Sequence, residues 1–213
     1  MVWGMEITTN SFPPNSPIPS RYALAKADPE TRVTFADNVS PHLSWTGVPD
    51  GTKSFAIICH DPDVPSKPDD VNQPDREVPE DLPRVDFFHW VLIDLPGDVQ
   101  ALEEGEFSDG VVAHGKQDRE GPRGTRQGLN DFTGWFSGDP DMEGKFYGYD
   151  GPAPPWNDSI IHHYIFTIFA LDVERVDVDG DFTGHDVRDA IEGHVLAETS
   201  LQGTYTQNPR LIG

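Results

Sequence analysis

The amino-acid sequence predicts a mainly β protein, and three observations support this prediction. Of the 213 residues, 20 are glycine and 20 are proline, a composition that interrupts long helices and favours short strands joined by irregular loops. The segments between these residues are rich in β-branched and aromatic types, and several alternate apolar with polar side chains. The 12 Phe, 5 Trp and 5 Tyr are enough large side chains to build a packed core.

Five strands are expected from the periodicity. Residues 5–11 and 195–206 alternate apolar and polar side chains, whereas residues 54–59 and 87–95 are apolar runs too aromatic and β-branched for a helix. Residues 162–171 are almost continuously apolar, which is typical of a strand buried on both faces. We therefore expect this last segment to lie at the middle of the core.

One helix is expected near the C-terminal end of the chain. Thr183 and Asp186 have the spacing of a capping box, and apolar residues follow at helical spacing. Gly193 is expected to end the helix. Within the strand that follows, Gly203 indicates a bulge or a close approach of another segment.

Two segments are expected to be loops. Residues 66–86 are rich in Pro and Asp with few apolar anchors, which predicts an extended acidic surface insertion within one domain spanning residues 1–213. Residues 117–128 carry Arg119, Arg123 and Arg126. Their glycines and arginines could cradle a phosphate, but the spacing matches no standard phosphate loop, so an ordinary surface loop is the favoured interpretation.

Charge and composition exclude several classes of function. The formal charge is −22, with 25 Asp and 12 Glu spread along the whole chain, so binding to nucleic acids or anionic membranes is electrostatically opposed. This surface suits high ionic strength, which suggests a salt-adapted organism. Cys59 stands alone, and no signal peptide or spanning apolar segment is readable. We therefore expect a cytoplasmic protein without an integral membrane segment.

Three short segments hold candidate site residues. Asp61 and Asp63 are separated by a proline directly after an expected strand, and His89 lies inside an aromatic strand. The third segment is a rigid proline loop, with Pro154 and Pro155, followed by His162 and Tyr164 at alternate positions and therefore on one strand face.

The motifs of well-understood enzymes are missing from these segments. No nucleophile elbow, zinc-protease, phosphate-loop or dinucleotide motif is found. A metal site formed by Asp61, Asp63, His89 and His162 is possible only if these residues converge in the fold, and no short-range spacing marks one. Nucleophilic catalysis is less favoured, because no serine has an evident base and the only cysteine lies in an apolar strand.

In their order along the chain, these segments resemble the phosphatidylethanolamine-binding protein family, in particular its bacterial and archaeal branch, which is described as Raf-kinase-inhibitor-like. Further matching segments are SPHLSW at 40–45, VPDGTKSF at 48–55, GLNDF at 128–132, FALD at 169–172 and GHVLA at 193–197. The resemblance implies a large central β-sheet, a smaller second sheet and one or two peripheral helices. It also implies a homodimer.

The resemblance further implies a non-enzymatic binding protein that regulates another protein, with a small pocket for an anion or a phosphorylated group and no cofactor. Carried over by motif, the pocket residues are Asp61, His89, Pro154, Pro155, His162 and Tyr164, with Asp63 as a further candidate. Asp61 is expected to orient and protonate a histidine. The acids of residues 66–86 are expected to hang over the pocket mouth and to discourage anions. Two alternatives stay open, namely an inhibitor of a kinase or protease that acts through surface loops, and a hydrolase that uses a His/Asp pair.

Overall fold

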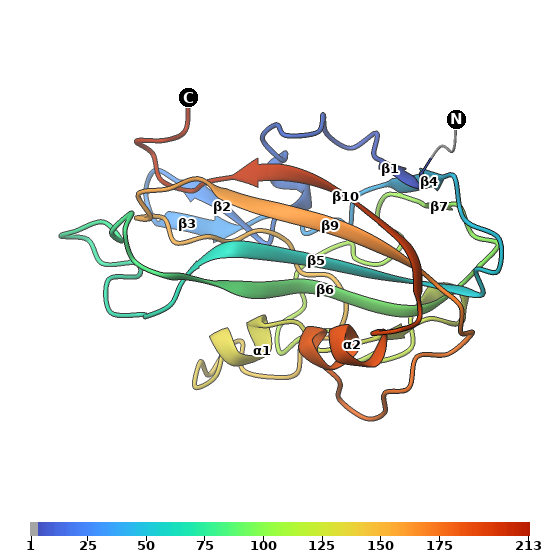
Figure 1. Cartoon of the computed structure of the whole chain (residues 1–213). Coiled ribbons are helices and arrows are strands. Elements are labelled where there is room, and N and C mark those ends of the chain that lie inside the picture. Colours follow the sequence, from blue (N-terminus) through green and yellow to red (C-terminus); the bar gives the residue numbers. More distant parts are fainter. Residues whose placement is uncertain (1–3) are drawn as a thin grey trace.

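The fold is built on a five-stranded antiparallel sheet with the strand order β10-β9-β5-β6-β8 (Figure 1). The computed structural model describes residues 4–213. A three-stranded sheet has the order β1-β4-β7, and β2 and β3 form a separate hairpin. The elements are β1 (Glu6–Thr8), β2 (Ala25–Asp28), β3 (Arg32–Phe35), β4 (Leu43–Thr46), β5 (Ser54–Pro65), β6 (Arg84–Pro96), β7 (Ala101–Leu102), β8 (Arg126–Gln127), α1 (Phe132–Trp135), β9 (His162–Leu171), α2 (Gly184–Ala190) and β10 (Val195–Tyr205), with short 3-10 turns at Ser20–Tyr22 and Pro122–Gly124. The predicted fold class is confirmed, and the β2–β3 hairpin is an addition to it.

Apolar side chains cover both faces of the large sheet. On one face Phe55, Trp90 and Phe166 pack with Trp45 of the small sheet in the larger core cluster. On the other face a second cluster surrounds Val187 of α2. Figure 1 shows the two α-helices on one side of the large sheet and the small sheet on the other. This layered burial is the main source of stability that the sequence offers.

The strand β9 has the predicted bounds, but the expectation of burial on both faces is wrong. Its residues alternate between fully and partly buried. β9 lies inside the sheet, between β10 and β5, yet the helical layer covers only part of the face to which His163, Ile165 and Thr167 belong. The opposite face is fully buried against the larger core cluster.

The strands β5 and β6 are longer than predicted, and their pairing contains three register shifts that the sequence pattern does not show. Asp61 pairs with Phe87 and Val64 with Val85, so β5 carries one extra residue over a stretch that contains Pro62. A proline is tolerated there because a bulge does not need its missing N–H. The prediction that the first of these strands ends near residue 60 is therefore wrong.

The connection between β5 and β6 is held against the body of the protein and is more than an exposed insertion. Val78 is fully buried and its N–H donates to the Asn157 carbonyl oxygen at 3.0 Å. The Asn157 side-chain amide donates to the carbonyl oxygens of Asp70, Gln73 and Arg76 at 2.7, 3.2 and 2.9 Å. One buried asparagine thus fixes most of a loop whose composition predicts little anchoring.

The predicted C-terminal helix and strand are confirmed, although the helix ends at Ala190, three residues before Gly193. Thr183 and Asp186 form a reciprocal capping box at the start of α2, and Gly193 follows the helix with a φ of +83°. Gly203 marks a close approach, since a Cβ atom there would lie 2.5 Å from the Ile18 side chain. The bulge of β10 lies elsewhere, between Val195 and Ala197. At the N-terminal end, β1 is shorter than the predicted strand at residues 5–11.

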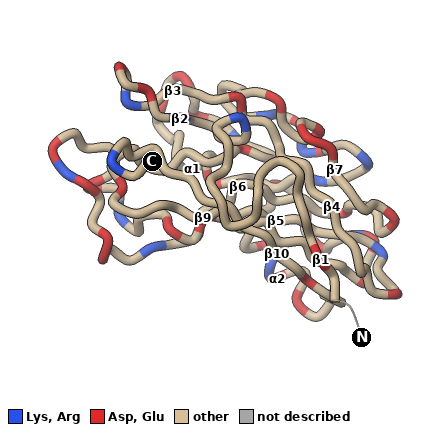
Figure 2. Tube along the Cα trace, turned by 90° about the horizontal axis from the view of Figure 1, so that it is seen from above, with Lys and Arg blue, Asp and Glu red and all other residues tan. Residues whose placement is uncertain are grey.

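The arginines of residues 117–128 are engaged by acidic side chains, which speaks against a phosphate cradle. Arg119 pairs with Asp181 at 2.9 Å, and Arg123 with Glu106 at 2.6 Å; Arg126 pairs with Asp94 at 2.5 Å. Figure 2 shows acidic positions spread around the whole trace, without a separate acidic end. None of the helices in residues 4–213 is long and apolar enough to cross a membrane.

Candidate functional site

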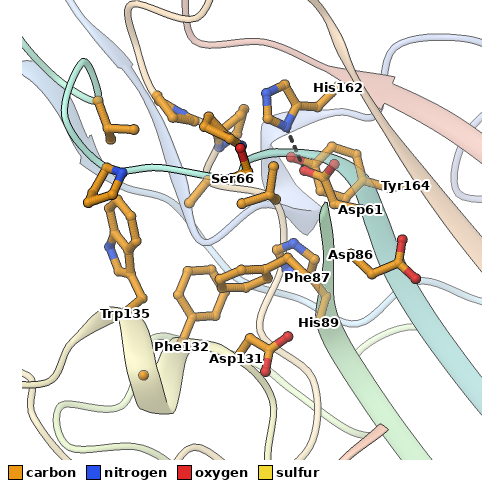
Figure 3. A pocket seen from close by; sticks show the side chains of 18 of the residues that line it. Asp61, Ser66, Asp86, Phe87, His89, Asp131, Phe132, Trp135, His162 and Tyr164 are labelled. Atoms are coloured by element: carbon orange, nitrogen blue, oxygen red, sulfur yellow. Dashed lines mark hydrogen bonds and ion pairs between the residues drawn. The ribbon is translucent and has the colours of Figure 1, made fainter. Parts of the chain in front are cut away.

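A cavity of about 400 Å³ opens at the end of the large sheet where β5, β6 and β9 meet α1 and the proline loop (Figure 3). Six of the seven candidate residues line it: Asp61, His89, Pro154, Pro155, His162 and Tyr164. Asp63 does not line it. Its carboxylate instead accepts hydrogen bonds from the backbone N–H and the ring Nδ1 of His163, at 2.7 and 2.8 Å.

The polar end of the cavity is organised by a chain of four charged side chains. His162 is completely buried, with Nδ1 2.6 Å from Asp61 Oδ2 and Nε2 2.7 Å from Asp158 Oδ2. Arg84 donates two hydrogen bonds to the Asp158 carboxylate, at 2.6 and 3.1 Å. This arrangement alternates acid and base, so its formal charges cancel when His162 is protonated.

The protonation of His162 follows from its two carboxylate neighbours. Burial by itself lowers the pKa of the imidazole, but the charge of Asp61 and the hydrogen bonds to Asp158 and Asp61 outweigh burial and raise the pKa to about 9. The pKa of the Asp158 carboxyl is lowered. Burial alone would raise it, but the hydrogen bonds from His162 and Arg84 outweigh the effect of burial. At neutral pH both ring nitrogens of His162 therefore donate to carboxylates, and neither is free for a ligand.

A β-bulge turns His89 toward the cavity. Cys59 pairs with Trp90 and His60 with Phe88, which leaves His89 as an extra residue on β6. Its ring lies 5.2 Å from the Tyr164 ring, centroid to centroid. Nδ1 donates to the Asp150 carbonyl oxygen at 2.8 Å, and Nε2 makes no hydrogen bond of ordinary geometry with residues 4–213. Burial lowers the pKa of His89, although the charge of Asp61 opposes this, so the neutral ring presents an unshared Nε2 lone pair.

Tyr164 provides a second free polar group at the same end. Its hydroxyl is buried and makes no hydrogen bond of ordinary geometry with residues 4–213. Burial, the nearby charge of Asp61 and a weak hydrogen-bonding interaction with its carboxylate raise the pKa of this phenol well above its usual value, so the hydroxyl keeps its proton. Figure 3 shows Tyr164, Asp61 and His162 together at one end of the cavity. A buried hydroxyl without a partner is an uncommon cost in a native structure, and a bound ligand or water would remove it.

The other walls of the cavity are mostly apolar. Phe87 and Phe132 meet edge to face with ring centroids 5.0 Å apart, and Trp135 stands at the far side (Figure 3). The end of β5 contributes Pro65, and the connection to β6 contributes Ser66, Lys67, Pro68 and Val71. Of the acids in residues 66–86 only Asp86 lines the cavity, and it pairs with Arg188 at 2.9 Å. The expectation that the acids of this segment hang over the cavity therefore holds for Asp86 alone, and Lys67 is the charged side chain that the loop contributes.

Sequence reasoning missed Asp158 and Arg84, which complete the charged chain. Asp158 lies four residues before His162, and Arg84 lies at the end of the acidic insertion. Neither belongs to a recognisable motif. Arg84 begins β6, whereas Asp158 lies in the loop before β9 and is bridged to Val78, so only the fold brings the two together. Among residues 4–213, no group of three or more His, Cys, Asp or Glu side chains is arranged to hold a metal ion.

Comparisons with known proteins agree with this architecture. The family model described as "Phosphatidylethanolamine-binding protein" matches residues 8–206. The UPF0098 protein YbhB of Escherichia coli is 38% identical over 170 residues, which are 80% of this chain and 83% of YbhB. A UPF0098 protein of Methanothermobacter thermautotrophicus is 35% identical over 201 residues, 94% of this chain and 98% of the relative.

A solved structure extends the likeness to the fold. The crystal structure of E. coli YbcL, described as a member of the mammalian PEBP family, superposes with a TM-score of 0.68 at 25% identity and covers 96% of this chain and 99% of YbcL. The family match spans most of the chain, and two relatives exceed 30% identity over four fifths of it or more. The chain therefore belongs to the phosphatidylethanolamine-binding protein family.

Proposed function

We propose that the cavity binds a small anion or a phosphorylated group, and that the protein acts without catalysis as a binding protein that regulates another protein. The family consists in general of non-catalytic binding proteins. The observation that carries the proposal is the pair of free polar groups at the polar end of the cavity. The Tyr164 hydroxyl makes no hydrogen bond of ordinary geometry with the described residues, and of the two ring nitrogens of His89 only Nδ1 is engaged, by the Asp150 carbonyl oxygen.

The electrostatics of the site support an anion in spite of the charge of −22. Asp61 and Asp158 are balanced by His162 and Arg84, so the charged chain presents no net charge to a ligand. Lys67 adds a positive charge to the lining, and Asp131 adds a carboxylate that accepts the Phe88 N–H at 2.7 Å. A few close donors in a cavity of low dielectric constant can outweigh a surface field that salt screens.

The tautomer of His89 sets the protonation state of the ligand. Nδ1 carries the proton that is donated to the Asp150 carbonyl oxygen, so Nε2 of the neutral ring can only accept. An anion binds next to it if the ligand keeps an acidic O–H, as a phosphate monoester does below its second pKa of about 6, or if Nε2 takes up a proton. Bound anion then raises the pKa of His89, so affinity increases as the pH falls from the pKa of the complex toward that of the free protein.

The same geometry gives little support to a hydrolase based on a His/Asp pair. A general base needs a free lone pair within reach of a substrate proton. In His162 both nitrogens face carboxylates at 2.6 and 2.7 Å, and the pKa of about 9 keeps the ring protonated at neutral pH.

Titration with inorganic phosphate and with O-phosphorylethanolamine, followed by NMR of the histidine ring signals, tests the proposal. We expect the His89 ring signal to shift with either ligand, and Tyr164→Phe to weaken binding by about tenfold or more, the value of one hydrogen bond to a charged group. Tyr147→Phe is the matched control, because that hydroxyl donates to Asp181 and does not line the cavity. If His89 does not respond at millimolar concentrations of either ligand, the proposal fails.

A further inference from the structure

A second cavity shares a wall with the first and belongs to no site described so far. It has a volume of about 460 Å³ and lies between the β2–β3 hairpin and α1. Four residues line both cavities: Phe132, Trp135, Ala153 and Pro154.

The lining of the second cavity is aromatic and uncharged. None of its lining residues is acidic or basic, which is unusual for a protein with a charge of −22. Phe35 and Trp135 stand at it with 50% and 47% of their surfaces exposed. Trp156 forms a further wall and is held in place by the Arg32 guanidinium, 4.2 Å from its ring centroid. Large aromatic side chains exposed beside a cavity are typical of a binding surface.

A buried side chain at this cavity has an unused hydrogen-bond acceptor. Gln207 lines the cavity and is only 3% exposed. Its amide Nε2 donates to the Pro154 carbonyl oxygen at 2.6 Å, which fixes the orientation of the amide. The amide oxygen Oε1 is buried and has no partner among the residues that the structure describes. Such an oxygen calls for a donor from outside the chain.

We propose that the second cavity binds a neutral, planar aromatic molecule that carries an N–H or O–H donor. The ring packs against Trp135 and Phe35, and the donor reaches Gln207 Oε1. A charged ligand is disfavoured, because it would lose its hydration without gaining a partner of opposite charge. This site is separate from the proposed anion site in the first cavity, although the two share a wall.

Indole and 1-methylindole form a matched pair of probes, because both present the same aromatic body and only indole has an N–H donor. In a ¹H–¹⁵N NMR titration of the full chain, we expect indole to shift the signals of Phe35, the Trp135 ring N–H and the Gln207 side-chain amide. We expect 1-methylindole to bind about fivefold more weakly, the value of one neutral hydrogen bond. Equal affinity of the two probes, or no response of these signals to indole at millimolar concentration, overturns the proposal.

Two exposed substitutions separate this site from the rest of the surface. Phe35→Ser removes one wall and is expected to weaken indole binding about tenfold, while the response of His89 to phosphate stays unchanged. Val112→Ser is the control, because Val112 is 44% exposed and does not line the cavity. If both variants bind indole as the unaltered protein does, the proposed location is wrong. A protein that binds phosphate but not indole refutes this inference alone, and one that binds indole but not phosphate refutes only the proposed anion site.

Discussion

The charged chain around His162 predicts a stability that depends on pH above neutrality. The folded protein holds the His162 proton more tightly than the unfolded chain, since its pKa rises from 6.5 to about 9. At about 1.4 kcal/mol for each pKa unit, this difference corresponds to about 3 kcal/mol of stability. Because the folded pKa is the higher one, the contribution is fully present below pH 6.5 and is lost as the pH rises through about 9.

Urea unfolding at a series of pH values between 6 and 10 measures this contribution. We expect the free energy of unfolding to fall by about 3 kcal/mol over this range, with most of the loss between pH 6.5 and 9. His163→Gln is the control variant, since His163 is half-exposed and pairs with Asp63 outside the cavity. It should keep the full pH dependence.

A variant at His162 itself leaves two buried carboxylates with one cation fewer, and such a chain is expected to unfold readily. The titration of the unaltered protein therefore provides the second measurement. The His162 ring signal should titrate near pH 9 in ¹H–¹³C spectra. A midpoint at or below 6.5, or a free energy of unfolding that is constant from pH 6.5 to 9, would refute the assignment of His162 as a buried cation.

Three further predictions concern the loop, the helix contact and the surface charge. Asn157→Ala removes the side-chain amide that holds the loop of residues 66–83. We expect the free energy of unfolding to fall by about 1–3 kcal/mol and proteolysis within that loop to become faster. An unchanged rate of cleavage would contradict this role of Asn157. Gly184→Ala places a Cβ 2.4 Å from Phe88 Cδ1 and should cost about 1–3 kcal/mol in urea unfolding. Gly134→Ala, with no atom within 4 Å, should cost nothing; similar losses in both variants would contradict the packing argument. Dialysis from about 1 M salt to about 0.01 M lengthens the Debye length from roughly 3 to 30 Å, so the 37 acidic side chains repel one another over a longer range. We expect both the stability of the fold and its affinity for phosphate to fall. An unchanged circular dichroism spectrum and an unchanged dissociation constant for phosphate would count against salt adaptation.

The elements that the sequence predicted best are those specified by neighbouring residues. The capping box at Thr183 depends on contacts three residues apart, and the run at 162–171 has a composition that only a strand suits. The extensions of β5 and β6 were missed because Pro62 normally argues against a strand. Only the pairing of the two strands shows that an extra residue there makes a bulge.

The candidate site was predicted as a set of residues and not as a network. The family resemblance identified Asp61, His89, His162 and Tyr164. Nothing in the sequence indicates that both ring nitrogens of His162 are hydrogen-bonded to carboxylates. That arrangement depends on Asp158, and no sequence motif predicts the contact between Asp158 and His162. The free groups of the cavity, which decide its chemistry, are defined by what the fold leaves without a partner and cannot be read from residue types alone.

The wall between the two cavities has a thermodynamic consequence. Pro154 and Trp135 line both cavities. If a ligand in one cavity displaces this wall, the binding free energy of a ligand in the other cavity changes. Linkage requires that the two effects be equal: the factor by which the first guest changes the affinity of the second is the factor by which the second changes that of the first. The shared wall of Phe132, Trp135, Ala153 and Pro154 therefore makes the two cavities a heterotropic pair, whose cooperativity can be measured with either ligand.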